Sequence, residues 1–394
     1  MNVIPVTHSY PRWEGDFAGA FIERLVGTLR SRSHLTSVIV PADRGRGGVL
    51  HQSGGLVRRV RYGLPGKETL AYSGNMVEAA GSVGGLGLVA SLILAQAGAV
   101  VSLARERPDP VVHAHWWIPG GIAAWLASSV LPLPYVVTLH GTDVGILERS
   151  GLARKIARLV LRRATAVTAV SSYLAERAAN ICGIDRSTIV VQPMPADTSR
   201  FQHLSTGGSG VVSVGRLKAQ KRIGLILEAM ALLRRRGREL PLKIVGDGPG
   251  KNALVHRAEK LGIGDLTEFV GAVDPEAIPA AIGDADVFAF PALHEGFGLA
   301  AAEALMLGVP VVAAKDGGGV LDVVPPGGPG RLVDPENPHD LAQAIDQLAV
   351  DPNARHLAAE RGRQLKQQLR PDRVAATFEH IYARALRRES REVA

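Results

Sequence analysis

The chain has 394 residues, which is long for one domain, and 46% of them are hydrophobic, enough to build the cores of two. Its one cysteine excludes an intramolecular disulfide, and no Cys or His spacing suggests zinc. The net charge of +8 lies wholly in residues 1–203, which carry 21 Lys and Arg against 13 Asp and Glu, whereas residues 204–394 carry 24 of each. This asymmetry predicts an anionic partner for the first half, with a solvated basic surface as the alternative.

The first half alternates short apolar runs with longer helical patterns. Strands are predicted at residues 3–7, 36–40, 110–114, 135–139, 166–170 and 188–191. Helices are predicted at residues 17–31, 82–105, 121–130, 152–163 and 173–181. This alternation predicts βαβ units around a parallel sheet.

A break and a second α/β series follow. Prolines at 193 and 195 and a Gly- and Ser-rich run at 205–210 predict a linker, so we place the domain boundary between 193 and 208. Further strands are predicted at residues 210–214, 242–245, 267–270, 287–290 and 310–313. We therefore expect domains at 1–200 and 201–370, and a tail segment, 371–394, whose helix packs back against the first domain.

Residues 79–104 hold no charged residue over 26 positions, which is long enough to span a bilayer. Several glycines interrupt this segment, and it leads directly into a predicted strand. We expect a buried helix of the first domain, with membrane contact as the alternative. Residues 1–16 lack the charged start and apolar run of a signal peptide, so we expect a cytoplasmic protein.

The most specific signal is a Gly-rich turn between a predicted strand and a predicted helix. The turn and helix start contain, in order, Glu295, Gly296, Phe297, Gly298, Leu299 and Glu303. Backbone N–H groups at a helix start attract phosphate, and glycine lets a ligand approach the backbone closely. Glu295 can reach a sugar hydroxyl, and Glu303 can accept hydrogen bonds from a ribose diol. The alternative is a helix whose acidic residues only stabilise its dipole.

Two cations follow the first strand of the second half. Arg216 and Lys221 come after the predicted strand 210–214 and precede a helical pattern. An arginine fork can grip phosphate oxygens, and a lysine acts as a point charge. The alternative is ordinary surface charge at a strand end.

Histidines and aspartates supply weaker signals. His140 follows strand 135–139, where the carboxyl end of a parallel strand faces the ligand crevice, although a structural loop histidine is the alternative. His113 and His115 resemble a metal pair but lack companion ligands, so we expect no metal there. The acidic run 284–286 ends a helix, and we interpret it as structural.

Together and in this order, the motifs resemble the GT-B glycosyltransferases of family 4 over nearly the whole chain. The segments that carry the resemblance are 15–19, His140 with Gly141, 215–217 with Lys221, 245–249, and Glu295 with Glu303, seven residues between them. The resemblance implies two Rossmann-like, doubly wound α/β domains that face each other across a cleft, with the C-terminal helix crossing back to the first domain.

The resemblance also implies roles for single residues. Arg216 and Lys221 would neutralise the donor diphosphate, and Glu303 would bind the ribose. Glu295 and the backbone of Gly296, Phe297, Gly298 and Leu299 would hold the transferred sugar, and His140 would contact that sugar from the opposite domain. Gly15 would let the first domain approach the phosphates, and Val270 would lie beside the base.

The implied activity is retaining transfer of a hexose-type sugar from a nucleoside-diphosphate sugar, a UDP-sugar before GDP-mannose. We expect a sugar or lipid-linked acceptor in cell-envelope, glycolipid or polysaccharide biosynthesis, with no cofactor and no essential metal. The alternatives are a nucleotide-sugar epimerase of the same fold or a non-catalytic nucleotide-sugar-binding partner protein. A nucleic-acid partner is not expected, since the chain lacks an aromatic-rich basic motif.

The chain departs from the family pattern at two positions. Asp16 stands where the family often has a second glycine after Gly15, and Asp322 stands where it often has a glutamate.

The basic, amphipathic segment 151–163 could rest on the anionic inner face of the membrane, although a helix with one core face and one solvated face is the alternative.

Overall fold

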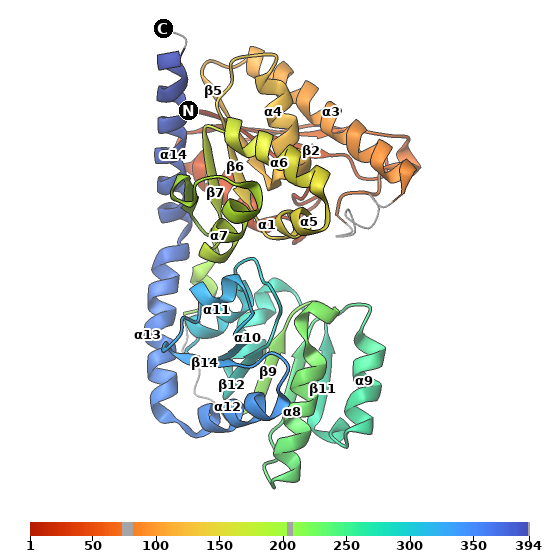
Figure 1. Cartoon of the computed structure of the whole chain (residues 1–394), viewed down its shortest axis with the longest axis vertical. Coiled ribbons are helices and arrows are strands. Elements are labelled where there is room, and N and C mark those ends of the chain that lie inside the picture. Colours follow the sequence, from red (N-terminus) through yellow and green to blue (C-terminus); the bar gives the residue numbers. More distant parts are fainter. Residues whose placement is uncertain (73–81, 203–207, 393–394) are drawn as a thin grey trace. The chain divides into compact units, whose positions relative to one another are not determined.

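The computed structural model describes residues 1–72, 82–202 and 208–392, which form two compact units. The first unit comprises Met1–Ala196 and Pro371–Ala394, and the second comprises Asp197–Arg370. Each unit is a mainly parallel sheet with helices on both faces (Figure 1). The predicted α/β class, with two doubly wound Rossmann-like domains, is therefore confirmed. The predicted linker run 205–210 and the start of the apolar segment 79–104 lie partly outside the described residues.

The sheet of the first unit has eight strands in the order β3-β4-β2-β1-β5-β6-β7-β8. All neighbours are parallel except β3 and β4. The strands are β1 (Asn2–Val6), β2 (Leu35–Pro41), β3 (Gly48–Gln52), β4 (Gly55–Val60), β5 (Pro110–His115), β6 (Tyr135–Leu139), β7 (Ala166–Ala169) and β8 (Ile189–Val191).

The sequence analysis predicts neither strand of the β3–β4 hairpin, and for β3 its exposure explains why. The six strands that were predicted are apolar runs, because helices cover both faces of a parallel sheet. All five residues of β3 are exposed, so the strand has no need of an apolar run. It lies at the edge of the sheet, antiparallel to β4.

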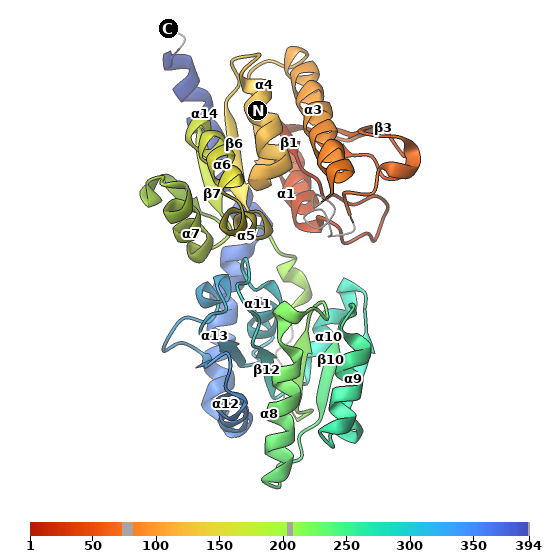
Figure 2. The same cartoon turned by 45° about the vertical axis from the view of Figure 1, so that its right-hand side comes forward.

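Helices of the first unit lie on opposite faces of its sheet (Figure 2). One face carries α1 (Ala20–Ser31) and α14 (Pro371–Glu392), which pack together in a core that includes Leu25, Leu29 and Phe378. The tail helix therefore belongs to the first unit. The remaining helices are α3 (Val83–Arg105), α4 (Ile122–Ser128), α5 (Thr142–Arg149), α6 (Gly151–Arg163) and α7 (Ser172–Cys182).

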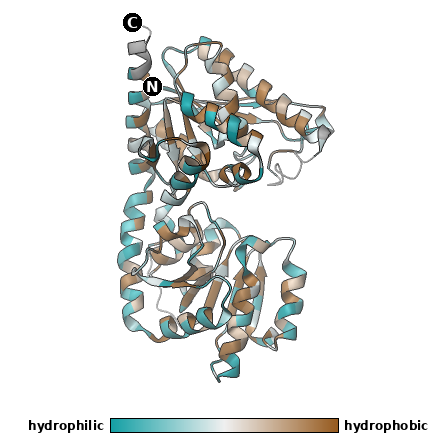
Figure 3. Cartoon of the chain, viewed as in Figure 1, coloured by the Kyte–Doolittle hydropathy of each residue, from teal (hydrophilic) through white to brown (hydrophobic). Residues whose placement is uncertain are grey.

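Helix α3 is long and apolar enough to cross a membrane by length and composition alone, over Gly84–Arg105. It is hydrophobic along its length, whereas α6 carries many hydrophilic residues (Figure 3). Leu92, Val100 and Leu103 are buried in the unit, while Leu86 and Leu94 are exposed. The helix thus has a core-facing side, as the buried-helix prediction requires, and an apolar side that faces outward.

The sheet of the second unit has six parallel strands in the order β11-β10-β9-β12-β13-β14. They are β9 (Val211–Val214), β10 (Leu242–Val245), β11 (Thr267–Gly271), β12 (Val287–Phe290), β13 (Val311–Ala314) and β14 (Gly330–Val333). The chain runs outward from β9 to β11, then restarts at β12 and runs the other way. The switch point of the sheet therefore lies between β9 and β12, where a doubly wound fold binds its ligand.

Helices cover both faces of this second sheet as well (Figures 1 and 2). They are α8 (Ile223–Arg235), α9 (Lys251–Lys260), α10 (Ile278–Gly283), α11 (Leu299–Met306), α12 (Pro338–Val350) and α13 (Pro352–Leu369). Helices α11 and α13 touch so closely that a Cβ on Gly362 would lie 2.0 Å from the carbonyl oxygen of Leu305. That approach positions α11, which begins at the Gly-rich turn.

Candidate active site

The Gly-rich turn joins β12 to α11 at the switch point of the second sheet. Gly298 is the residue before α11 and has a φ of 89°, a backbone conformation that L side chains rarely adopt. A Cβ there would also lie 2.9 Å from a methyl group of Val320. No side chain caps the helix, so its first N–H groups are directed toward the end of the turn. A helix start of this kind favours phosphate.

Glu295 is held in place through its backbone. Its N–H donates to the carbonyl oxygen of Gly317 at 2.8 Å, and its own carbonyl oxygen accepts from Gly319 N–H at 2.7 Å. The turn after β12 is thus paired with the Gly-rich loop after β13. Its carboxylate Oε1 lies 2.6 Å from Lys221 Nζ, and both side chains are largely shielded from solvent.

The loop after β9 presents the two predicted cations. Buried Leu217 anchors this loop, because its N–H donates to the carbonyl oxygen of Asp247 and its carbonyl oxygen accepts from Gly250 N–H. Lys221 Nζ lies 4.9 Å from the ring centre of Phe290, while Arg216 is exposed. Lys221 and Glu295 therefore meet from loops that follow adjacent strands.

An ion pair that the sequence did not predict holds the same region. Arg222 donates from Nη1 and Nη2 to the two carboxylate oxygens of Asp316, at 2.7 and 2.8 Å. Arg222 has a φ of 49°, unusual for a residue with a side chain. Asp316 also accepts from His294 N–H through its carbonyl oxygen. The two residues are 94 positions apart and belong to no recognisable motif. Nothing in the sequence therefore indicates that they pair.

The other predicted donor residues of the second unit have different surroundings. Phe297 is half-buried in the turn, Leu299 is 41% exposed at the start of α11, and Glu303 is half-buried one turn later on that helix. Val270, at the carboxyl end of the edge strand β11, is 39% exposed and two strands away from β9. The structure therefore gathers Lys221 and Glu295 in direct contact and sets Val270 apart from them.

In the first unit, His140 follows β6 and packs among aromatic rings. Its ring centre lies 4.3 Å from that of Trp116 and 5.3 Å from that of Phe21. The backbone N–H groups of His140 and Gly141 donate to the buried carboxylate of Asp143. Burial, followed by the neighbouring histidines His113 and His8, lowers the pKa of His140 well below its usual value of 6.5. The imidazole is therefore neutral at neutral pH.

Gly15 lies on the loop after β1, with a φ of 85° and no heavy atom within 4 Å of where a Cβ would stand. Asp16, which stands where the family often has a second glycine, has hydrogen-bond partners within the same loop. Its buried carboxylate accepts from Arg12 at 2.7 Å and from Ala18 N–H at 3.2 Å, and these bonds stabilise the loop. At the other departure, Asp322, the bond is made by the backbone, whose carbonyl oxygen accepts from Arg361 at 2.5 Å.

The residues considered for metal binding have other partners. His113 is hydrogen-bonded to the hydroxyls of Tyr382 and Thr138, both at 2.7 Å. Asp286 accepts from the N–H groups of Gly208 and Gly210 and pairs with Arg355. Among the residues that the structure describes, no group of three or more His, Cys, Asp or Glu could hold a metal ion.

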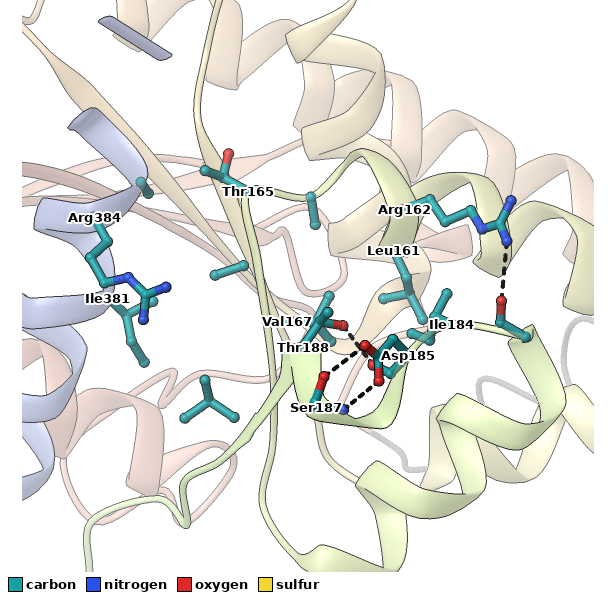
Figure 4. Close-up of a pocket in the computed structure, with 15 residues that line it drawn as sticks. Leu161, Arg162, Thr165, Val167, Ile184, Asp185, Ser187, Thr188, Ile381 and Arg384 are labelled. Carbon is teal, nitrogen blue, oxygen red and sulfur yellow. Dashed lines mark hydrogen bonds between the residues drawn. The ribbon is translucent and has the colours of Figure 1, made fainter. Parts of the chain in front are cut away.

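A cavity of about 530 Å³ lies elsewhere, at the amino ends of β7 and β8 in the first unit (Figure 4). Arg384 of α14 and Arg162 of α6 stand on opposite sides of it, and Asp185 is bonded to Ser187 at its edge. None of the predicted site residues lines this cavity. The carboxyl ends of the strands, where the ligands of doubly wound sheets bind, are the better candidate.

Comparison with known proteins matches each unit to one family model. The description "Glycosyl transferase 4-like domain" matches residues 18–195, and "Glycosyl transferases group 1" matches residues 196–365. Glycogen synthase of Mycobacterium tuberculosis is 28% identical over 408 residues, which cover 99% of this chain and 96% of that protein. A GDP-mannose-dependent alpha-(1-6)-phosphatidylinositol monomannoside mannosyltransferase of Mycolicibacterium smegmatis is 32% identical over 55% of this chain and 61% of its own length.

Solved structures share the fold. Sucrose-phosphate synthase from Thermosynechococcus elongatus superposes with a TM-score of 0.78 at 20% identity, over 97% of this chain and 98% of that one. Anabaena HepE, in complex with UDP-glucose, gives a TM-score of 0.72 at 20% identity, over 96% and 98%. With both units matched and the Gly-rich turn at the switch point, the chain belongs to family 4 of the GT-B glycosyltransferases.

Proposed function

We propose that this glycosyltransferase moves a hexose from a UDP-sugar to a sugar or lipid-linked acceptor, with retention of configuration. The observation that carries the proposal is the meeting of Lys221 and Glu295 beside the uncapped start of α11. A cation, a carboxylate and a helix start at one switch point suit a nucleoside diphosphate joined to a polyhydroxyl ring.

The proposed chemistry needs charge stabilisation on the leaving group. Breaking the bond between sugar and phosphate leaves negative charge on the diphosphate and positive charge on the sugar. Arg216, Lys221 and the start of α11 stabilise the departing diphosphate, because fixed cations and dipoles need no reorganisation during reaction. Glu303 binds the ribose, and His140 contacts the transferred sugar. Gly15 leaves room for the phosphates.

UDP is the favoured donor nucleotide, supported by HepE, which was solved with UDP-glucose. GDP-mannose is the second candidate, supported by the mannosyltransferase of Mycolicibacterium smegmatis. Thermal-shift measurements with UDP, GDP, ADP and CMP on the wild type and Glu303→Ala distinguish them. A ligand at 100 times its Kd adds about 2.7 kcal/mol of stability. We expect UDP to stabilise the wild type and not the variant.

Product analysis tests the reaction itself. Incubation with UDP-glucose and an acceptor should give a glycoside with the anomeric configuration of the donor, which the H1–H2 coupling constant reports. An inverted product would refute retention, and an epimerised nucleotide sugar without a glycoside would favour the epimerase alternative. A nucleotide that binds without any turnover would favour a non-catalytic partner protein.

For the acceptor, we propose contact between α6 and an anionic membrane on the cytoplasmic side. Leu152 and Leu159 of this helix are 69% and 53% exposed, although both are apolar. Its exposed cations are Arg154, Lys155, Arg158, Arg162 and Arg163. Leucines among cations on one exposed surface suit the headgroup region of anionic lipid.

Vesicle co-sedimentation tests this contact. We expect binding to vesicles with phosphatidylglycerol and not to pure phosphatidylcholine, and loss of binding when the five α6 cations are changed to Gln. The control is Arg235→Gln with Arg236→Gln at the end of α8, which should bind as the wild type does. Binding that survives neutralisation of α6 would contradict the proposal.

A further inference from the structure

Histidine side chains gather at the carboxyl ends of β1, β5 and β6 in the first unit. His8 follows β1, His113 and His115 lie on β5, and His140 follows β6. The ring centres of His8 and His140 lie 4.2 and 4.3 Å from that of Trp116. His115 is fully buried, and its Nδ1 lies 3.1 Å from Nε2 of His140. His140 therefore has a buried histidine directly behind it.

The two facing nitrogens share one proton, and burial indicates which ring carries it. Nε2 of His115 is buried and has no hydrogen-bond partner among the described residues. If His140 were the donor, the proton of His115 would lie on that Nε2 as an orphaned N–H group. Orphaned buried N–H groups are rarer than unpaired acceptors, and an unsatisfied buried group costs about 1–3 kcal/mol. The arrangement favours a proton on Nδ1 of His115, which donates to His140.

The bond from His115 also determines the protonation of the second ring nitrogen of His140. Since its Nε2 accepts, a neutral His140 must carry its own proton on Nδ1, the nitrogen turned away from His115. The two ring nitrogens of a histidine are not equivalent, and the bond that one makes decides the state of the other. His140 is then a neutral N–H donor.

We propose that His115 is a positioning residue, whose Nδ1–H bond to His140 Nε2 fixes His140 as the Nδ1–H tautomer that donates to an oxygen of the transferred sugar. This inference rests on the proposed role of His140 and adds the atom that makes the contact. A neutral donor suits the reaction, because positive charge develops on the sugar and would repel an imidazolium.

The surroundings of His115 hold its ring in one orientation. His113 packs on it with ring centres 4.2 Å apart. His113 is itself fixed at both nitrogens, by the hydroxyls of Tyr382 on α14 and Thr138 on β6. Burial, then the neighbouring histidines, lowers the pKa of His115 well below 6.5 and keeps it neutral. A bond between two neutral, packed rings can persist without a charge.

Three substitutions test the positioning role. In His115→Asn the amide nitrogen stands near the place of Nδ1 and can still donate, whereas His115→Gln places its amide near Nε2, and His115→Leu has no donor. We expect turnover to fall about 10–100-fold in the Leu and Gln variants, the range for partners that orient a functional histidine, and to be largely recovered in the Asn variant. The KM for the donor should change little, since the nucleotide-binding residues are untouched.

The result that overturns the proposal is an Asn variant as inactive as the Leu variant while both keep the wild-type thermal midpoint. Wild-type turnover in the Leu variant would overturn it as well. A merely structural role would predict losses that follow the stability of each variant and not its hydrogen-bonding nitrogen.

A spectroscopic measurement tests the tautomer without substrate. Two-bond ¹H–¹⁵N correlations of protein labelled at histidine distinguish Nδ1–H from Nε2–H rings, and His140→Gln identifies the signal of His140. We expect Nδ1–H in the wild type and loss of that preference in His115→Leu. An Nε2–H ring at His140 in the wild type would refute the proposal. An enzyme inactive with every donor would instead refute the proposed function, and the spectrum would still decide the His115 contact.

Discussion

Lys221 Nζ lies 2.6 Å from Glu295 Oε1, and this ion pair joins loops that are 74 residues apart in the sequence. The two side chains are the proposed diphosphate and sugar ligands, and they neutralise each other before a donor binds. A donor diphosphate must therefore share Lys221 with Glu295. The pair also keeps the lysine in place, since an unpaired side chain would sample many rotamers.

The first prediction concerns this pair. Glu295→Gln should leave UDP affinity unchanged or raise it a few-fold, because Lys221 no longer has a competing partner worth up to about 1 kcal/mol. Turnover of the UDP-sugar should fall, because the sugar loses a ligand. Calorimetry with UDP and initial rates check the two effects. The control is Glu228→Gln on α8, which removes a partner of Arg257 on α9. A variant that loses UDP affinity would contradict the competition.

The second prediction concerns Arg222 and Asp316. A double-mutant cycle with Ala at both positions should show a coupling of about 1 kcal/mol or more, because the bidentate pair is mostly shielded from solvent. Arg222→Gly should be more stable than Arg222→Ala, because glycine adopts the positive φ without strain. Urea denaturation measures all of these variants. Equal stability of the Gly and Ala variants would argue against backbone strain at this position.

The third prediction concerns the diphosphate. Arg216→Ala should lower kcat about 100-fold or more, because removing one donor to a developing anion typically costs about 2.7–4 kcal/mol in transition-state free energy. Lys260→Ala, which removes an exposed cation at the end of α9, should behave as the wild type. Near-normal turnover in a folded Arg216→Ala protein would rule out the role.

The fourth prediction concerns acid stability. Burial lowers the pKa of His113 to about 3 and that of His8 to about 4. Below pH 6.5 the unfolded chain therefore binds protons that the folded chain does not, so the stability supplied by the neutral rings is complete above that pH and is lost as the pH falls.

The variant His113→Asn tests this prediction by denaturation at several pH values. The wild type should be more stable at pH 7.5, and its advantage should shrink by about 1 kcal/mol for each pH unit between 6 and 4. The exposed His256 provides the matched control, since His256→Asn should follow the wild type at every pH. An advantage that is constant with pH would contradict this, because it would show that His113 takes up its proton over the same pH range in the folded and the unfolded states.

The fifth prediction concerns metal. In the proposed site, Arg216 and Lys221 are the positive charges for the diphosphate. The carboxylate of Asp286 in the acidic run 284–286 is already occupied by two backbone N–H groups and Arg355. We therefore expect initial rates to change less than twofold in EDTA. Loss of activity that magnesium restores would contradict this.

The sequence alone determined the fold class and most of the sheet. Buried strands such as β6 and β12 are mainly apolar runs, so local composition predicts their positions. The Gly-rich turn before α11 was also readable, because a positive φ at Gly298 and a helix start have local signatures. The exposed strand β3 and the short, polar helix α5 had no such signature.

Contacts between residues far apart were decided by tertiary structure alone. The Arg222–Asp316 pair, the hydrogen bond between His115 and His140 and the hydrogen bond between Tyr382 and His113 each join segments that are far apart in the sequence. The alternation of His113 and His115 places both on one face of β5, but it does not reveal the neighbours on that face. The chemistry of His140 depends on those neighbours, because a proton shared between two rings is set by distance and burial and not by the order of residues.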